Sequence, residues 1–354
     1  MKIIHEWAQH TDDSKKNNFV RVLFLDYAKA FDRIDPNILI SKLKRLNIPD
    51  YIIAWLRSFL DNRQQCVKLN NVFSDWMDIW GNVPQGTLLG ILLFLIMIND
   101  LIMPCPSIKF VDDTSVYDMS TFSDSNNLGK LQEAADYAGV WSCQNNMKLN
   151  PDKCKEMNIY FCTRIPSPII HPISIDGKQL EQVTCFKVLG VYVNRTLTWC
   201  DHINYIYKKA SKRVYNIILL KRAGLQASDL CKIYCAMIRS ILEYAAPVWH
   251  PGVTIEQSIL LESVQKRVFK IILPDHDYES ALVYLKISNL KDRREHLTKS
   301  FFIKVKGHDD KLNHLLCLKT NNTYNLRSND IYETPMCQTN RFKNTLIPYS
   351  LFNF

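Results

Sequence analysis

The sequence predicts a mixed α+β fold for about the first 200 residues and a helical fold after them. Up to residue 200, short apolar runs that fit strands alternate with segments of helical periodicity, and from Asp201 onward apolar residues recur at helical spacing. Apolar residues make up 47% of the 354 residues and charged residues 22%, which is the balance of a folded globular protein. At roughly 150 residues per domain, this length allows about two domains.

The first elements follow from apolar runs and their flanking residues. Residues 21–25 (RVLFL) form a short apolar run that predicts a buried strand ending at Asp26. Pro36 then opens a helix for which Asp35 is the expected N-cap. Residues 50–60 carry apolar side chains at helical spacing and predict a second helix.

The middle of this region predicts hairpins around one apolar helix. Residues 65–80 alternate in polarity and predict two strands joined by a turn at Asn70-Asn71. The apolar run 88–98 is too long and too rich in Leu for one strand, so it predicts a buried helix. Further elements complete the region: a strand–turn–strand at 108–117, a helix at 127–146, and strands at 155–162 and 185–193.

The composition changes at Asp201, where we expect a domain boundary near residue 200. A helix begins there, and basic residues fall between its apolar positions; further helices are predicted at 229–244 and 256–273. The last 40 residues or so have weak periodicity and many Asn and Thr, so we expect a poorly ordered tail.

The charge and the cysteines indicate which partners and which cellular environment to expect. The 44 Lys and Arg outnumber the 35 Asp and Glu, and the net charge of +9 favours polyanionic partners, nucleic acid first. None of the 11 cysteines lies in a C-x-x-C pair, which indicates reduced thiols in an intracellular protein, nuclear or cytoplasmic. The longest apolar run is too short for a membrane span and the first 18 residues do not resemble a signal peptide, so no membrane association is expected.

Three carboxylates lie where apolar strands end or turn. Asp26 ends the first strand, and Asp112 and Asp113 lie at the turn of the 108–117 hairpin. Adjacent acids repel each other unless a cation or water relieves them, and carboxylate oxygens are the ligands that Mg²⁺ prefers. Taken alone, the Asp pair is more often an ordinary turn, because Asp is a common turn residue.

The segments around these acids form an ordered set. Residues 26–32 (DYAKAFD), 83–90 (VPQGTLLG) and 110–113 (FVDD) resemble motifs A, B and C of the reverse transcriptases of non-LTR (LINE-like) retrotransposons, in the same order. Residues 150–153 (NPDK) resemble motif D, and residues 188–191 (VLGV) resemble motif E, the strand pair that grips the primer. Each motif alone is weak evidence for this resemblance, whereas the five motifs together are highly specific.

The resemblance covers about residues 19–300 and implies a domain organisation. It implies a polymerase palm, an antiparallel sheet with packed helices, over 19–200, and a helical thumb and following region over 201–310. Residues 1–18 would then be an N-terminal remnant, and residues 311–354 a C-terminal tail.

The resemblance also implies catalytic roles. Asp26 and Asp112 would bind two Mg²⁺ (or Mn²⁺) ions, with Asp113 beside them, and the enzyme would join a dNTP to a primer 3′-hydroxyl without a covalent intermediate. Lys153 would protonate the leaving pyrophosphate, although a solvated surface lysine is at least as good an interpretation.

Three residues would select the nucleotide. Phe31 would be the steric gate against a 2′-hydroxyl, and Gln85 and Gly86 would line the template and nucleotide pocket. Without the motif context, Phe31 is a core residue and Pro84-Gln85-Gly86 is a plain turn. Gly86 lacks a Cβ and so would let the backbone come close to a base or sugar.

The basic helix would contact the RNA template and DNA primer through their phosphates. Such contacts are independent of base sequence and sensitive to salt. A solvated helix face is an equally good interpretation of these side chains. The residues concerned are Lys208, Lys209, Lys212 and Arg213.

The sequence also departs from the family pattern. Only about 20 residues precede Asp26, so the basic residues of a fingers region are missing, and the chain is interpreted as an N-terminally truncated copy. Asn82 stands where Gly is usual, Ile91 where Pro is usual, and Val111 where Ala is commoner. We therefore expect weak or no primer extension by the chain alone.

Two other functions remain open. The chain could be a catalytically inactive remnant that binds nucleic acid through its basic thumb. It could instead be a protein-interaction module that recruits a partner at an exposed edge of the palm sheet. No G-x-x-x-x-G-K-[ST] run is present, which excludes a P-loop as the site of triphosphate binding. Because five motifs occur in order, an unrelated protein with a coincidental Asp pair is a remote alternative.

Overall fold

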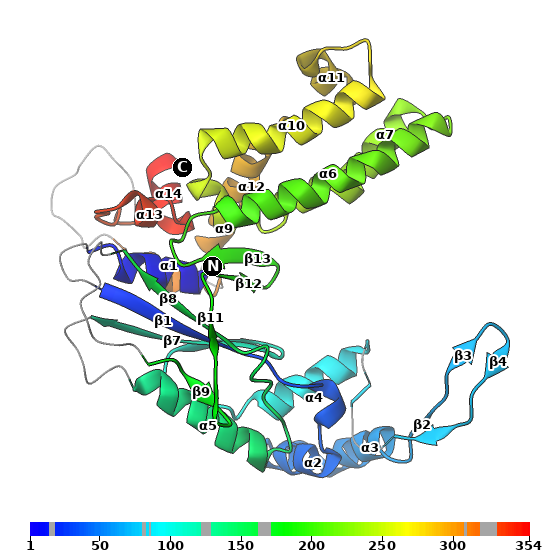
Figure 1. Cartoon of the computed structure of the whole chain (residues 1–354), viewed down its shortest axis with the longest axis vertical. Coiled ribbons are helices and arrows are strands. Elements are labelled where there is room, and N and C mark those ends of the chain that lie inside the picture. The colour runs from blue at the N-terminus through cyan, green and yellow to red at the C-terminus, as the bar shows by residue number, and fades with distance from the viewer. Residues whose placement is uncertain are drawn as a thin grey trace. The chain divides into compact units, whose positions relative to one another are not determined.

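The computed structural model describes residues 1–13, 18–79, 83–84, 86–121, 129–161, 171–307, 310–318 and 331–354. The chain divides into two compact units (Figure 1). The sheet unit comprises residues 19–158 and 164–183, and the helical unit comprises residues 1–18, 159–163 and 184–354.

The sheet unit is built around a five-stranded sheet in the order β11-β8-β1-β7-β6. Strands β6 and β7 pair antiparallel, whereas β11 runs parallel to β8 at the other edge, so the sheet is not antiparallel throughout. The sheet strands are β1 (Asn18–Leu25), β6 (Ser107–Phe110), β7 (Asp113–Thr121), β8 (Lys155–Tyr160) and β11 (Glu181–Gln182). The helices are α2 (Pro36–Arg45), α3 (Asp50–Leu60), α4 (Leu88–Ile98) and α5 (Lys130–Gln144), with the 3₁₀ turn η1 (Phe31–Arg33).

Local sequence signals explain where these helices begin. The Asp35 side chain accepts hydrogen bonds from the N–H groups of Asn37 and Ile38, and Pro36 occupies the first turn of α2, as predicted. Thr87 caps α4 in the same way, because its hydroxyl accepts the Gly90 N–H at 3.0 Å.

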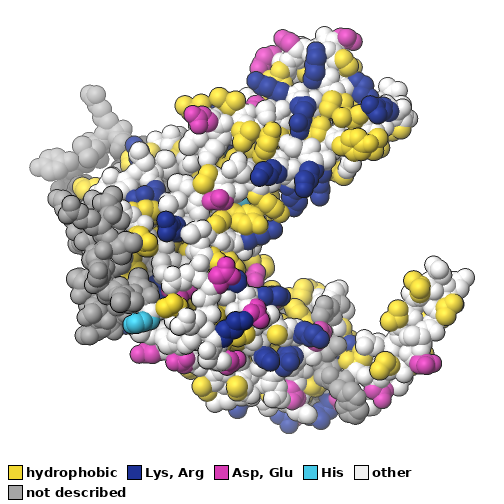
Figure 2. All heavy atoms as spheres, viewed as in Figure 1, with side chains coloured by type: hydrophobic (Ala, Val, Ile, Leu, Met, Phe, Trp, Pro, Cys, Tyr) yellow, Lys and Arg dark blue, Asp and Glu magenta, His cyan; other side chains and the backbone are white. Residues whose placement is uncertain are grey.

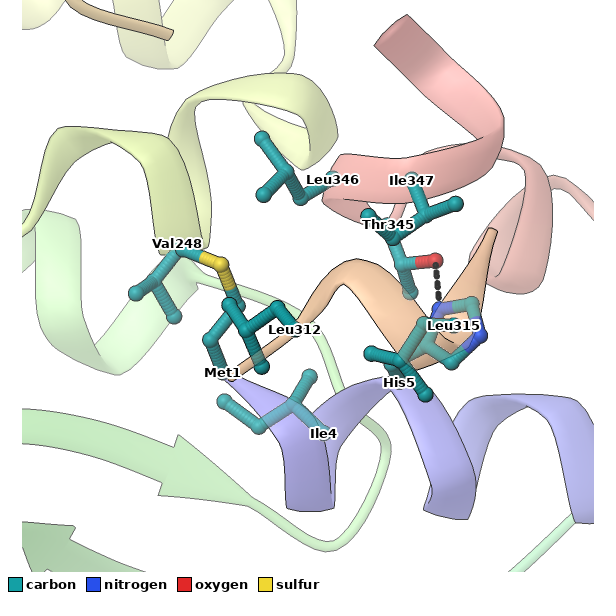
Figure 3. Close-up of a pocket in the computed structure, with 9 residues that line it drawn as sticks. All are labelled: Met1, Ile4, His5, Val248, Leu312, Leu315, Thr345, Leu346 and Ile347. Carbon is teal, nitrogen blue, oxygen red and sulfur yellow. Dashed lines mark hydrogen bonds between the residues drawn. The ribbon is translucent and has the colours of Figure 1, made fainter. Parts of the chain in front are cut away.

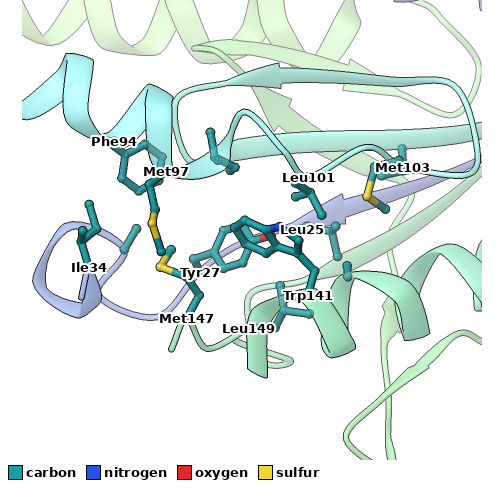
Figure 4. Packing of buried hydrophobic residues seen from close by; sticks show 14 of the residues in the cluster. Leu25, Tyr27, Ile34, Phe94, Met97, Leu101, Met103, Trp141, Met147 and Leu149 are labelled. Atoms are coloured by element: carbon teal, nitrogen blue, oxygen red, sulfur yellow. The ribbon is translucent and has the colours of Figure 1, made fainter. Parts of the chain in front are cut away.

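The core of the sheet unit lies between the central strands and the helices. Every β1 residue from Phe19 to Leu25 is buried, which fits a central strand. Helix α5 packs against β7, and α2 packs against both α3 and α4. Figure 4 shows the buried residues between them, including Phe94 and Met97 of α4 and Trp141 of α5.

Two predictions about the middle of this unit have different outcomes. The turn at Asn70-Asn71 is confirmed, because Leu69 pairs with Val72 in the antiparallel hairpin of β3 (Lys68–Leu69) and β4 (Val72–Phe73). The helix at 88–98 is also confirmed, but it is not buried all round: Leu88 is 87% exposed and Leu92 52% exposed, because only one face of α4 meets the core. Short strands complete the unit: β2 (Gln64–Gln65), β5 (Met77–Asp78), β9 (Ser174–Ile175) and β10 (Lys178–Gln179).

The helical unit combines a hairpin with a set of packed helices. Helices α6 and α10 lie side by side, as Figure 1 shows. The hairpin is β12 (Cys185–Val188) and β13 (Val191–Asn194). The helices are α1 (Lys2–His10), α6 (Cys200–Arg222), α7 (Ala227–Tyr234), α8 (Ser240–Glu243), α9 (Ala246–Trp249), α10 (Ile255–Ile272), α11 (Tyr278–Leu285), α12 (Leu290–Val305), α13 (Asn340–Lys343) and α14 (Leu346–Asn353), with a π-helical turn at Cys235–Arg239 and 3₁₀ turns at His250–Gly252 and Asn313–Leu315.

The first and last parts of the chain pack together inside the helical unit. The Asp12 carboxylate accepts the N–H groups of Gln338 and Thr339, each at 2.8 Å, and the Thr339 hydroxyl at 2.6 Å. Figure 3 shows the neighbouring small cavity, where the Thr345 hydroxyl lies 3.4 Å from Nδ1 of His5. Burial lowers the pKa of His5 to about 4. This imidazole is therefore neutral at physiological pH and is part of the core.

The units do not follow the bounds expected from composition. Residues 1–18 and the β12–β13 hairpin fall in the helical unit, whose long C-terminal segment starts at Thr184 rather than near residue 200. The expectation of a poorly ordered tail is wrong for residues 331–354, since Phe342 and Ile347 are at most 3% exposed. Within the described residues, no helix is both long enough and apolar enough to cross a membrane.

Candidate active site

Asp26 directly follows the central strand, and the motif D segment holds its backbone. The Asp26 N–H donates to Sγ of Cys154 at 3.3 Å, and the Asp26 carbonyl accepts the Asn150 N–H at 2.9 Å. Tyr27 and Leu149 form an antiparallel bridge beside them. The Lys153 ammonium lies 3.7 Å from Oδ1 of Asp26, which is an ion pair beyond hydrogen-bond length. Motifs A and D therefore meet at the end of β1.

The Asp pair lies at the tip of the β6–β7 hairpin. Phe110 pairs with Asp113, so Val111 and Asp112 form a two-residue turn. Val111 has a φ of 56°, a left-handed conformation that is strained for a β-branched residue. This strain is stored in the turn that presents the two carboxylates.

The three carboxylates lie at the ends of neighbouring strands: Asp26 follows β1, and Asp112 and Asp113 lie where β7 begins. β7 is the neighbour of β1, and Asp113 interacts electrostatically with both Asp112 and Asp26. Burial raises the pKa of Asp113, and the two neighbouring carboxylates raise it further. Burial also raises the pKa of Asp26; the Lys153 charge opposes this effect, and Asp112 adds to it. The charges of these three acids thus interact unfavourably in the folded chain.

The chemistry of these three carboxylates fits a hard divalent cation. Oδ1 of Asp26 is buried and has no hydrogen-bond partner, and its environment disfavours an uncompensated negative charge. A divalent cation would satisfy this atom and relieve the repulsion among Asp26, Asp112 and Asp113. In the part of the chain that the structure describes, no three His, Cys, Asp or Glu side chains are close enough together to hold an ion as they stand.

Phe31 joins motif A to motif B. Its ring stacks on Phe94 of α4, with ring centroids 4.7 Å apart and an interplanar angle of 27°. Its carbonyl accepts the Val83 N–H at 3.1 Å. The side chain is half-buried, so one part of the ring is fixed by the core while another part faces solvent.

The two glycines of motif B have different structural roles. Gly86 has a φ of +80° and open space where a Cβ would lie, so its backbone conformation explains the glycine. A Cβ on Gly90 would lie 2.2 Å from the carbonyl oxygen of Pro84, so close packing explains that glycine. The sequence had singled out Gly86 for close approach, and Gly90 was the missed residue. Gln85 lies outside the described residues.

Two lysines that the sequence analysis missed fix motif B against its neighbours. Lys109 of β6 donates to the carbonyls of Ile98 and Leu101, at 3.0 and 2.9 Å, just beyond the last turn of α4. Lys42 of α2 donates to the Met97 carbonyl at 2.6 Å and also contacts Asp100. Cations are favourable at a helix C-terminus, so these lysines lock α4 to α2 and to the hairpin that carries Asp112.

The basic face of α6 is only partly free. Lys208, Lys209 and Lys212 are exposed, but Arg213 is half-buried and donates to the Met237 carbonyl at 2.9 Å. Figure 2 shows Lys and Arg side chains among hydrophobic ones over this part of the molecule. The three lysines are therefore available to an anionic partner, while Arg213 is engaged in packing.

An aromatic and basic cluster at the start of α6 was also missed. The rings of Tyr192 and Tyr205 lie 4.9 Å apart, and the Lys187 ammonium lies 4.8 Å from the centre of the Tyr205 ring. The hydrogen bond from Lys187 lowers the pKa of Tyr205. The cluster connects the β12–β13 hairpin to the basic helix.

Comparison with known protein families identifies the family to which the chain belongs. The family described as reverse transcriptase (RNA-dependent DNA polymerase) matches residues 1–193, which is more than half of the chain. The chain belongs to the reverse transcriptase family. The α+β fold and the resemblance to non-LTR retrotransposon enzymes are thereby confirmed, and the relatives of this reverse transcriptase domain agree with them.

Three of its relatives are mobile-element proteins of Drosophila melanogaster. The probable RNA-directed DNA polymerase from transposon BS is 29% identical over 271 residues, which is 71% of this chain and 28% of that protein. The probable polymerase from transposon X-element is 27% identical over 73% of this chain and 29% of its own length. The RNA-directed DNA polymerase from mobile element jockey is 29% identical over 64% of this chain and 25% of its own. The chain thus spans less than a third of the relatives it matches.

Solved structures also resemble this reverse transcriptase domain at low similarity. Telomerase from Candida albicans, in complex with telomeric RNA, aligns with a TM-score of 0.39 and 12% identity over 81% of this chain and 53% of that one. Apo telomerase from Candida tropicalis aligns with a TM-score of 0.41 and 12% identity over 89% of this chain and 55% of that one.

Proposed function

We propose that this chain is the palm and thumb of an RNA-directed DNA polymerase that extends a DNA primer on an RNA template with dNTPs. The observation that supports this is the placement of Asp26 after β1 and of Asp112 and Asp113 at the start of the neighbouring strand β7, with interacting charges, in a chain of the reverse transcriptase family. Residues 19–200 would be the palm and residues 201–310 the thumb, in an intracellular protein.

The carboxylates would hold two Mg²⁺ or Mn²⁺ ions. Asp26 and Asp112 would be the ligands, with Asp113 beside them. Such ions, when bound, lower the pKa of the primer 3′-hydroxyl and neutralise charge on the transferred phosphate. The oxygen of the primer then bonds to the α-phosphorus, and the bond to the β-phosphate oxygen breaks.

The remaining residues of the site would position the substrates. Lys153 lies beside Asp26 and would give a proton to the departing pyrophosphate. Phe31 is fixed by its stacking on Phe94, so its solvent-facing part can exclude a 2′-hydroxyl. Gln85 and Gly86 would line the nucleotide pocket.

The basic helix would hold the primer–template duplex. Lys208, Lys209 and Lys212 are exposed on α6 and can each neutralise a phosphate. Arg213, which the sequence placed with them, would contribute less because its guanidinium already donates to Met237.

Primer extension with purified protein tests the polymerase. The Asp112→Asn, Asp113→Asn double variant is expected to abolish incorporation, because it removes two of the three carboxylates proposed to hold the ions. Asp136→Asn is the matched control, since this exposed acid lies on α5, away from the group. Equal incorporation by the wild type and the double variant would refute the proposal.

A metal-binding measurement gives a readout that does not depend on activity. Mn²⁺ binding followed by electron paramagnetic resonance should be weakened in the double variant and unchanged in Asp136→Asn. Unchanged Mn²⁺ binding in the double variant would place any ion elsewhere.

A second candidate is nucleic-acid binding without catalysis. The exposed lysines of α6 support it, together with the lack of a closed ligand set among the described residues. Salt-sensitive binding of a primer–template duplex without incorporation would favour this function over the polymerase.

A further inference from the structure

Two cysteines share one face of the helical stretch Ala227–Glu243. Cys231, Cys235, Arg239 and Glu243 recur at four-residue intervals, and residues four apart on a helix are neighbours. Cys231 is buried, at 8% exposure, whereas Cys235 is half-buried and so reaches solvent. The two thiols are therefore neighbours on this face.

The backbone at this pair is unusual. Cys235 begins a five-residue π-helical turn, Cys235–Arg239, between α7 and α8. Such turns are rare, and they occur frequently at functional sites. The carbonyl of Met237 in this turn is the acceptor for Arg213 of α6, at 2.9 Å. A change in backbone conformation at Cys235 would therefore affect α6 through the hydrogen bond from Arg213 to Met237.

The surroundings of Cys235 are electropositive. Nε of Arg239 lies 3.1 Å from Oε1 of Glu243, and Nε of Arg293 from α12 lies 3.4 Å from the same oxygen. Two guanidinium groups thus share one carboxylate, which leaves net positive charge beside the thiol. The neighbouring Cys231 thiol lowers the pKa of Cys235 and the arginines lower it further, against burial and Glu243. The Cys235 thiol and burial together raise the pKa of Cys231.

We propose that Cys235 and Cys231 form a peroxide-reactive dithiol, with Cys235 as the nucleophile and Cys231 as the resolving thiol. The site is independent of the polymerase function proposed above. A partly exposed thiol in an electropositive site beside a second thiol is the arrangement of redox-sensitive cysteines.

The reaction balances with hydrogen peroxide as the oxidant. The Cys235 thiolate attacks one peroxide oxygen, the O–O bond breaks, and the second oxygen leaves as water after taking up a proton. The resulting Cys235 sulfenic acid is attacked by the Cys231 sulfur, which forms the S–S bond and releases a second water. Two thiols are oxidised and one peroxide is reduced to two waters.

The disulfide would strain the helix. Cβ atoms four residues apart on a helix are about 5–6 Å apart, whereas a disulfide needs about 3.5–4.5 Å. The backbone must therefore tighten between Cys231 and Cys235, next to the π-helical turn that holds Arg213. We expect oxidation to loosen the contact between α7 and α6.

Competition among the cysteines of the intact, reduced chain tests the nucleophile without any variant. Limiting iodoacetamide at pH 7, followed by peptide mass spectrometry, should alkylate Cys235 roughly fivefold faster than the more exposed Cys143 and Cys200. Cys200 is a suitable internal reference because its sulfur lies 3.5 Å from the Asp201 carboxylate. Faster alkylation of Cys143 or Cys200 would overturn the assignment.

Peroxide treatment tests the pair. The wild type should lose two hydrogens in a disulfide linking Cys231 and Cys235. Cys231→Ser should stop at the sulfenic acid, trapped on Cys235 by dimedone, and Cys143→Ser should behave as the wild type. Peroxide oxidation of Cys235 no greater than that of Cys200 would refute the proposal.

Discussion

The buried thiol of Cys154 contacts both backbone polar groups of Asp26. Its sulfur accepts the Asp26 N–H at 3.3 Å, and the thiol donates to the Asp26 carbonyl at 3.7 Å. Burial raises the pKa of Cys154, so it remains a protonated donor. Cys154, which has no proposed catalytic role, thus positions Asp26, which is a proposed metal ligand.

Replacing this thiol should affect both stability and activity. Cys154→Val keeps a similar volume but leaves the Asp26 N–H without its acceptor, which should lower the free energy of unfolding by about 1–2 kcal/mol. Urea unfolding measures this change. Cys143→Val, on the exposed face of α5, is the control and should change little. An unchanged midpoint for Cys154→Val would show that the sulfur contacts are dispensable.

The pH dependence of stability should reveal the repulsion at the site. Because the pKa of Asp113 is raised in the folded state, this group contributes favourably below the ordinary Asp pKa and that contribution is lost as pH rises through the folded-state pKa. Asp113→Asn should therefore stabilise the chain at pH 7, by about 0.5 kcal/mol after allowing for solvent screening. Thermal unfolding between pH 4 and 7 should show this gain shrinking as pH falls. A gain that is constant with pH, or a loss at pH 7, would argue against like-charge repulsion.

Gly90 should tolerate no side chain. Gly90→Ala would place its Cβ 2.2 Å from the Pro84 carbonyl oxygen, and relieving this clash should cost about 1–3 kcal/mol of stability. Gly139→Ala is the matched control, because it lies within α5 with nothing near its Cβ position and should stabilise by about 0.5–1 kcal/mol. If the two substitutions had the same effect on urea unfolding, the close approach at Gly90 would be disproved.

Salt dependence should separate the lysines of α6 from Arg213. Replacing Lys208, Lys209 and Lys212 together by Gln should weaken binding to a primer–template duplex and reduce the slope against the logarithm of salt concentration by about 2–3. Arg213→Gln should change the slope by less, since its guanidinium is held at Met237. Fluorescence anisotropy over a salt series measures both. A larger effect for Arg213→Gln would reverse the assignment.

Local signals were enough to predict most elements of the sheet unit. The Asp35 cap, the turn at Asn70-Asn71 and the hairpin around Asp112 each depend on residues adjacent in the chain, and the structure contains all three. The placement of Asp26 at the end of one strand and of Asp112 at the turn before its neighbour was also predictable, because each follows from a local apolar run or hairpin. Cys154 and Lys109 were not, since each acts on a backbone group distant in sequence and neither residue type signals such a contact.

Residues 331–354 also could not be predicted from local sequence. Residues 331–354 contain few periodic apolar positions, and their order depends on partners near residue 12 rather than on their own propensity. Composition can report whether a segment could form a core alone, but not whether another segment will cover it.

The bond from Thr339 to Asp12 spans 327 positions of the chain. During synthesis, α1 and Asp12 are made well before Gln338 and Thr339, so the Asp12 carboxylate has no donor from these residues until they have been made. Apolar residues of α1 such as Trp7, which is fully buried in the folded chain, therefore lack part of their cover until these later residues are made. Fragments that omit residues 338–347 should, for the same reason, be prone to aggregate during expression.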